Sequence, residues 1–142
     1  MNGSVIDQLI IIGRLALAAA LAGLIGWQRE KAHRPAGFRT HILIGLGAAL
    51  FTIVSANFAG ADPSRIAAGV VTGIGFLGAG AIMHKSRVVE GLTTAASIWA
   101  TAAIGIAVGV GFYIIGIVAA LIVFLVLLLP HPGENGKHGD DV

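Results

Sequence analysis

Residues 66 to 83 read IAAGVVTGIGFLGAGAIM, an 18-residue run that contains five glycines and no formal charge. The segment GIGFLG (73–78) fits the G-x-G-x-x-G pattern of dinucleotide-binding turns. Such a turn needs a preceding strand and an acidic residue about 20 positions further on, and here that position is Thr93. A charge-free run of this length instead matches the roughly 20 residues needed to cross a hydrocarbon core of about 30 Å. The stretch therefore predicts a membrane helix.

The composition of the chain also indicates a lipid environment. Of the 142 residues, 56% are hydrophobic and 11% are charged, whereas a soluble domain carries about 25% charge. Cysteine is absent, which excludes disulfides and thiolate metal sites. The first 13 residues contain no Lys or Arg, and the apolar run there is too long for a signal peptide. We therefore interpret it as the first membrane span.

Five apolar stretches are long enough to be spans: residues 5–26, 40–59, 66–83, 92–109 and 112–129. The last two are uncharged and adjoin each other, and as one helix they would be about 57 Å long, nearly twice the core. The glycines at 109 and 111 offer a tight turn between them. The predicted fold class is all-α, a polytopic membrane bundle of five transmembrane helices. It forms one domain over residues 1–130, and residues 131–142 are predicted to be a disordered cytoplasmic tail.

Basic residues predict the orientation of the bundle. Segment 27–40 (WQREKAHRPAGFRT) holds four Lys or Arg, segment 84–91 (HKSRVVEG) holds two, and the tail holds one. All seven fall on one side of a five-span protein, and only Arg65 falls in a loop on the other side. The positive-inside rule therefore predicts an outside N-terminus and a cytoplasmic C-terminus.

The glycines of residues 66–83 predict the position of that helix in the bundle. Spacings of three and four residues distribute them over two faces, and small residues on two faces let neighbouring helices approach from both sides. We therefore expect this helix to be central, with Asp62 as its N-cap and Pro63 in its first turn. The alternative is that glycine is simply commoner in membrane helices. The glycines assigned to helix packing are Gly69, Gly73, Gly75, Gly78 and Gly80.

Four segments resemble the MgtC/SapB family of bacterial inner-membrane proteins: GLIGWQRE (23–30), GFRTHILIGLGAALF (37–51), DPSRIAAGVVTGIGFLGAGAIM (62–83) and VEGLTTAASIWATAAIGIAVGVGFY (89–113). The resemblance implies about five transmembrane helices in the bacterial inner (plasma) membrane. It also implies a link to magnesium homeostasis, to growth in low magnesium and to virulence, through survival inside host cells. MgtC-like members carry a cytoplasmic C-terminal domain, so a chain that ends soon after Pro130 resembles the short SapB type.

Arg14 is a candidate functional residue within the first span. It lies about 13 Å along the helix from Val5, so we expect it near mid-membrane, slightly to the outer side. A charge at that depth is expensive and is often functional. The alternative is a structural ion pair or snorkelling, with Asp7 or Asp62 as the carboxylate within reach.

A second group of polar residues lies at the predicted cytoplasmic ends of the first two spans. Arg29 and Glu30 could form a network with Arg39, Thr40 and Glu90, where Glu90 precedes the N-terminus of the fourth helix. The alternative is that these charges only set topology and form a local ion pair. The full candidate polar network is Arg14, Arg29, Glu30, Arg39, Thr40, Asp62, Arg65, Glu90 and Thr94.

Hydroxyl groups follow one face of the fourth span, at Thr94, Ser97 and Thr101. Such groups often bond within the helix or to a neighbouring helix, and a polar path is the alternative interpretation. His41 and His84 lie at the predicted cytoplasmic boundary and are expected to be interfacial. They are far apart in the sequence and have no third ligand, which disfavours a metal site.

The sequence contains no Ser-His-Asp set, no paired carboxylates and no metal-ligand spacing. We therefore expect no enzymatic activity, no cofactor and no nucleic acid. Magnesium prefers carboxylate oxygens and retained water, whereas the spans carry no Asp or Glu at mid-depth and Arg14 would repel cations. We favour a regulatory or partner-binding module that contacts lipid and either another membrane protein or a second copy. The alternative is an ion transporter, with magnesium as the ion.

Overall fold

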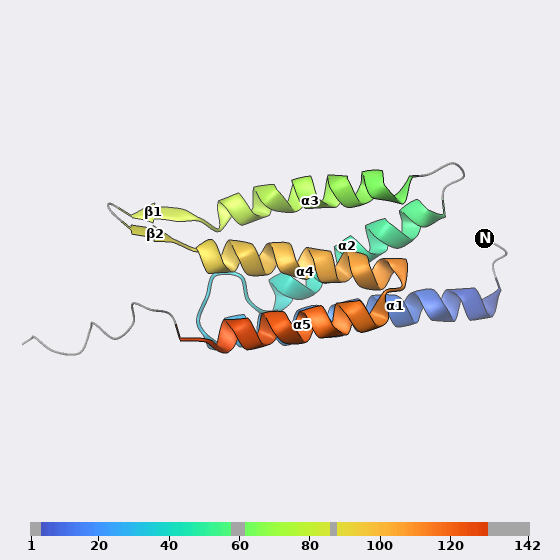
Figure 1. Cartoon of the computed structure of the whole chain (residues 1–142), viewed down its shortest axis with the longest axis horizontal. Helices are drawn as coiled ribbons and strands as arrows, with labels where there is room; N and C mark the ends of the chain where they lie inside the picture. Colours follow the sequence, from blue (N-terminus) through green and yellow to red (C-terminus); the bar gives the residue numbers. More distant parts are fainter. Residues whose placement is uncertain (1–3, 58–61, 86–87, 131–142) are drawn as a thin grey trace, which may run out of the picture.

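The computed structural model describes residues 4–57, 62–85 and 88–130 of the chain. Within these ranges it is a bundle of five helices, as predicted, with one short β-hairpin that was not predicted from the sequence (Figure 1). The elements are α1 (Val5–Lys31), α2 (Phe38–Ala56), α3 (Pro63–Gly80), β1 (Met83–Lys85), β2 (Val88–Glu90), α4 (Leu92–Val110) and α5 (Tyr113–Leu128). The predicted tail, 131–142, lies outside the described residues.

The helices run along a common direction and give the bundle two ends. Figure 1 shows the α1–α2 connection and the β-hairpin at one end, which we call the hairpin end, and the N-terminus of α1 at the other. The two basic segments of the sequence therefore lie at the same end. Helices α1, α2 and α4 are long and apolar enough to cross a membrane, and α3 and α5 are shorter apolar helices. Helix α1 continues to Lys31, five residues beyond the predicted span.

Specific residues set the ends of the helices. Asp62 accepts a hydrogen bond from the Ser64 amide at 3.0 Å and caps α3, with Pro63 in the first turn, as predicted. The predicted break between the last two helices is confirmed at Gly111, whose φ of 105° is favourable for glycine alone. Gly91 also has a positive φ, of 92°, and a Cβ there would collide with the Ala81 carbonyl. Only glycine can therefore make the turn from the hairpin into α4.

Helix α4 is the centre of the bundle and contacts all four other helices. Glycines allow its close approach to α2. A Cβ on Gly105 would collide with the Gly45 carbonyl and come within 2.9 Å of Ala48, and one on Gly109 would lie 2.9 Å from the Ala49 carbonyl. Tight glycine packing therefore exists in this fold, between α2 and α4.

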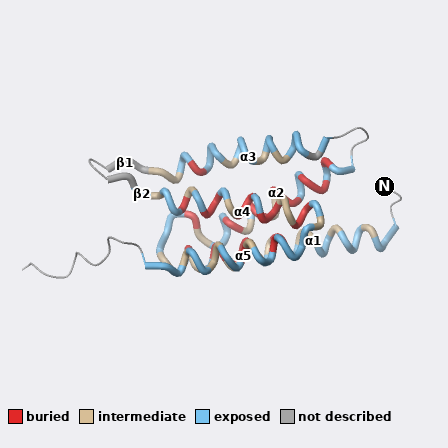
Figure 2. Tube along the Cα trace, in the orientation of Figure 1, coloured by how far each residue is buried: buried red, intermediate tan, exposed pale blue. Residues whose placement is uncertain are grey.

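The prediction that α3 is the central helix is wrong. Figure 2 shows most of α3 as exposed, whereas α4 carries many buried positions. A Cβ added at Gly69, Gly73, Gly75 or Gly80 would meet no atom of the described chain within 4 Å, and at Gly78 it would make only ordinary contact, 3.7 Å from Ala95. The glycine count of a helix does not reveal which of its faces has a partner. The small residues of α2 and α4 match each other, so those two helices form the close contact.

Candidate functional site

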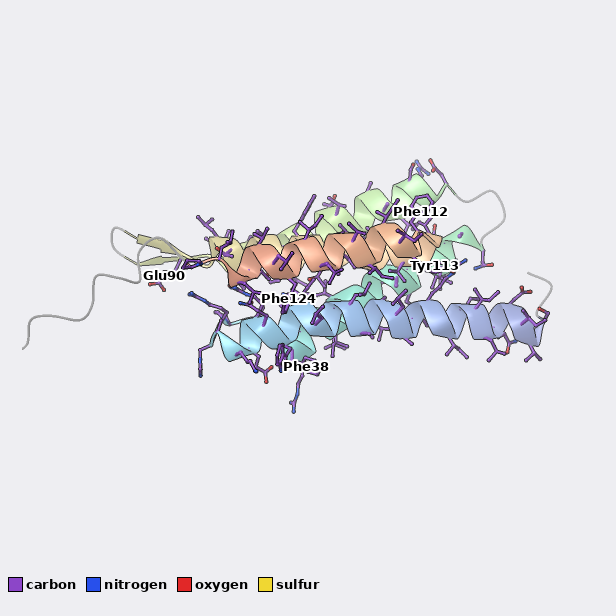
Figure 3. The ribbon with its side chains drawn as sticks, turned by 60° about the horizontal axis from the view of Figure 1, so that its bottom comes forward. Phe38, Glu90, Phe112, Tyr113 and Phe124 are labelled. Carbon is purple, nitrogen blue, oxygen red and sulfur yellow. The ribbon has the colours of Figure 1, made fainter. Side chains whose placement is uncertain are left out.

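Arg14 ties α1 to the turn between α4 and α5. Its Nε donates to the Tyr113 hydroxyl at 2.8 Å, and its Nη1 donates to the Gly109 carbonyl at 3.0 Å. The guanidinium carbon also lies 5.7 Å from the centre of the Tyr113 ring. Figure 3 shows Tyr113 at the start of α5. Arg14 therefore lies at the level where α4 ends and α5 begins, and not half-way along the bundle. The expected pairing with Asp7 or Asp62 is therefore replaced by contacts to an aromatic hydroxyl and a backbone carbonyl.

A buried polar cluster joins α1, α2 and α4 near the hairpin end. It consists of Arg29, His41, Thr94 and Ser97, which are all at most 4% exposed. Arg29 Nη2 donates to Thr94 Oγ1 at 3.0 Å, and the Ser97 hydroxyl donates to the Thr94 carbonyl at 2.8 Å. His41 Nε2 lies 3.2 Å from Ser97 Oγ. The cluster thus connects three helices through side chains that are removed from water and lipid.

The expectation that His41 is interfacial is wrong, because its side chain is fully buried. Its Nδ1 lies 2.9 Å from the Gly37 carbonyl, which can only accept, so Nδ1 carries a hydrogen. In a neutral ring, Nε2 then accepts from the Ser97 hydroxyl, which can alternatively donate to the Thr94 carbonyl. Gly26 makes the burial feasible, since a Cβ there would lie 2.9 Å from His41 Cβ.

The predicted network around Arg29 and Glu30 forms only in part. Arg29 bonds to Thr94, a residue of the candidate list, but Glu30 Oε2 accepts from the Phe38 amide at 2.8 Å and so caps α2. Arg39 and Thr40 are exposed. Glu90 is the last residue of β2, at the hairpin end of the bundle (Figure 3).

The two candidates at the opposite end lie apart from the buried cluster. Asp62 is the N-cap of α3, and the hydrogen bonds from Ser64, hydroxyl first and amide second, hold its pKa below the ordinary value. Arg65 is exposed in the first turn of the same helix. These two residues therefore belong to the start of α3 and do not extend the network.

Sequence reasoning missed the role of Gln28, whose Nε2 donates to the Leu127 carbonyl at 2.8 Å and holds α5 against α1. It also missed that Arg29 is buried, with an Nε that has no hydrogen-bond partner among the described residues. The one available signal is that Arg29 and Gly26 share a helix face with Ala22, which indicates an inward-facing side. Within residues 4–57, 62–85 and 88–130, no three His, Asp or Glu side chains converge as a metal site.

An apolar groove of about 630 Å³ separates α2 from α3 along most of their length. We call it the α2–α3 groove and define it by Leu43, Gly47 and Phe51 of α2 and Gly69, Gly73 and Leu77 of α3. Arg65 lies at one end and Thr40 at the other. None of its three glycines meets an atom within 4 Å at its Cβ position, so their missing side chains help to form the open space.

Comparison with known proteins identifies the family of this chain. A model of the MgtC family matches residues 15–135. The chain belongs to the MgtC family. The match begins at residue 15, within α1, and extends beyond the end of α5. It confirms the resemblance inferred from the sequence motifs.

Several MgtC-family relatives are similar over most of the chain. The protein named "Putative magnesium transporter YhiD" from Escherichia coli (strain K12) is 50% identical over 83% of this chain and 59% of its own length. "Protein MgtC" from Brucella abortus (strain 2308) is 44% identical over 83% of the chain and 50% of its own length. "Protein MgtC" from Salmonella typhimurium (strain 14028s / SGSC 2262) is 45% identical over 80% and 49%. The chain thus spans about half of these relatives, and no solved structure matches it.

Proposed function

We propose that this MgtC-family chain is a multi-pass protein of the bacterial inner membrane, with its N-terminus outside and the hairpin end in the cytoplasm. It acts in magnesium homeostasis as a regulatory module, neither an enzyme nor a carrier. Its action is to seat a transmembrane helix of another membrane protein in the α2–α3 groove.

The open glycine face of α3 is the observation that carries this proposal. Gly69 and Gly73 form a G-x-x-x-G pair, which in membranes lets a second helix approach closely and gain van der Waals contact. A Cβ added at either glycine would meet no atom of the described residues within 4 Å. From Thr40 to Phe51 the groove follows α2 for about 16 Å, or three helical turns, which is enough for the middle of a partner helix.

The proposed link to magnesium rests on the relatives, since the name of the Escherichia coli protein refers to magnesium transport. The polar groups of the bundle favour a regulatory link over a conducting path. Magnesium is held by oxygen ligands, mostly carboxylates and water, but the five helices contain only Asp7 and Glu30 as acidic residues, one near each end of α1. The buried cluster contributes the guanidinium of Arg29, which repels a cation.

Two measurements test the proposal. The purified chain in liposomes that contain a magnesium-sensitive dye is expected to give no flux above empty liposomes, and a flux that requires the protein would overturn the regulatory role.

The second measurement is a photocrosslink in cells from position 43, at the groove wall. We expect one discrete adduct with another membrane protein that disappears when Gly73→Leu fills the groove and persists in Ala103→Leu, on an exposed face of α4. An adduct that survives Gly73→Leu would refute the groove as the docking site. A dimer of this chain would show that the occupant is a second copy and not a partner protein.

A further inference from the structure

A second hollow runs along the other side of α2, between α2 and α1. Its apolar part, about 550 Å³, is lined by Ala20, Gly23, Trp27, Phe38 and Ile42 among others. A neighbouring hollow of about 430 Å³ shares Trp27 and Phe38 and continues to Glu30, Lys31 and His33. The two form one continuous surface, the α1–α2 groove, which leads from mid-bundle to the hairpin end over about 18 Å.

The two ends of the α1–α2 groove differ in chemistry. The end near mid-bundle is apolar, and the small residues Ala19, Ala20 and Gly23 are part of its lining. The end of the groove at the hairpin end of the bundle is basic, because Lys31 and His33 line it and Arg34 follows in the same exposed turn.

The acidic residue at this end is already engaged. Glu30 Oε2 accepts from the Phe38 amide, which holds this oxygen at the start of α2, and the two cations of Lys31 and Arg34 outnumber the one carboxylate. The turn itself is fixed by backbone bonds from the His33 amide to the Glu30 carbonyl and from the Arg34 amide to the Arg29 carbonyl, both 3.0 Å long. The cationic side chains therefore project from a defined backbone at the rim of the groove.

Trp27 marks the level where the apolar part meets the polar part. The residue is 47% exposed, and Lys31 Nζ lies 3.9 Å from the ring centre. Tryptophan and lysine at the end of an apolar helix are typical of the headgroup level of a bilayer. The groove thus enters the acyl layer at one end and the headgroup layer at the other.

We propose that the α1–α2 groove is a binding site for an anionic phospholipid. One acyl chain lies along Ala20, Gly23 and Ile42, and the phosphate meets the cations of Lys31 and Arg34, with the His33 ring as a further donor. Basic pockets between helices on the cytoplasmic side favour anionic headgroups. The site is independent of the function proposed for the α2–α3 groove.

Other occupants fit this groove less well. A zwitterionic lipid offers no net charge to the two cations. A second copy in a symmetric dimer would bring its own basic turn to the same level of the membrane, so like charges would face each other. The basic rim thus selects an anionic lipid over both.

The test uses Trp27 as a reporter in the full chain, with Trp99→Phe removing the other tryptophan. Reconstituted protein is titrated with brominated phosphatidylglycerol or brominated phosphatidylcholine, which quench fluorescence on contact. Each cation should raise the affinity for an anionic headgroup about fivefold. Phosphatidylglycerol should therefore be preferred over phosphatidylcholine roughly 5- to 25-fold, and salt should weaken the preference. Equal quenching by both lipids would overturn the proposal.

Variants identify the site. Lys31→Gln with Arg34→Gln should bring the preference close to one, whereas Arg65→Gln, at the opposite end of the bundle, should leave it unchanged. Ala20→Phe should reduce quenching by brominated phosphatidylglycerol, and Ala103→Phe should not. Circular dichroism would show that each variant is folded. A preference that survives the double charge change would contradict the site.

Two further arms exclude other ligands. Inorganic phosphate at millimolar concentration should not restore fluorescence, and competition by phosphate alone would show an anion site without a lipid. Protection of Trp27 that grows with the protein-to-lipid ratio would show that a second copy covers the groove.

Discussion

Gly105→Ala should destabilise the protein, whereas Gly73→Ala should not, although both replace a glycine within an apolar helix. The new methyl at 105 would collide with the Gly45 carbonyl and lie 2.9 Å from Ala48 Cβ. The carbonyl is backbone, so α2 or α4 must shift. Overpacking of this kind costs about 1–3 kcal/mol and occasionally more, against a gain of at most about 1 kcal/mol from helix propensity.

At Gly73 the methyl meets nothing within 4 Å, so only the propensity gain of up to about 1 kcal/mol applies. The propensity gain is common to both variants and cancels, so they should differ by about 1–3 kcal/mol in their free energy of unfolding. The assay is reversible unfolding in mixed micelles of a mild detergent and dodecyl sulfate, followed by far-UV circular dichroism. Equal stability, or a larger loss at Gly73, would refute the assignment of α4 as the central helix.

Three further changes probe single contacts. Tyr113→Phe removes the hydroxyl that accepts from Arg14 and should cost about 0.5–1.5 kcal/mol in the same unfolding assay; an unchanged free energy would show that this bond does not hold α1 to the turn. Thr94→Val deprives the buried Arg29 guanidinium of its acceptor and should cost about 1–3 kcal/mol. Thr93 is exposed, so Thr93→Val is the matched control and should change the free energy of unfolding by nearly zero. Asp62 has a lowered pKa, so its contribution is present above the unfolded pKa and is lost as pH falls through the folded pKa. The gap in thermal midpoint between wild type and Asp62→Asn should thus begin to close only below about pH 4, the ordinary Asp pKa, and should vanish below the lowered folded pKa; a gap that does not narrow in acid would exclude this cause.

The number and type of helices follow from the sequence because their cause is local. Length without charge determines a span, and Gly111 and Asp62 determine where helices end through their own backbone geometry and side chain. The family motifs are also readable directly. These features depend on neighbouring residues and need no knowledge of how the helices pack.

The arrangement of the helices could not be predicted in the same way. Glycines occur in α2, α3 and α4, and only the pairing of surfaces shows that Gly105 meets Gly45 while Gly73 faces open space. Arg14 illustrates the same limit, since its acceptors, Tyr113 and the Gly109 carbonyl, lie about 100 residues away in the sequence. Reasoning that looks only for a carboxylate partner of an arginine overlooks hydroxyl and carbonyl acceptors of this kind.

The burial of His41 is a further example. A histidine one turn inside a helix can face either water or the bundle, and the difference depends on the absent side chain of Gly26 on another helix. The buried polar cluster is thus a product of packing. The sequence indicated Arg29 and the hydroxyl face of α4 as candidates, but not the burial of Arg29 and His41.

Growth of bacteria in low magnesium with the Gly73→Leu variant is the most direct test of the central claim that the α2–α3 groove carries the function. The leucine enters open space, so the protein should reach the membrane in normal amounts, as an immunoblot would show. We predict that growth fails both in a strain that lacks the protein and in one that carries Gly73→Leu, while Ala103→Leu supports growth fully. Normal growth with the groove filled would contradict the account.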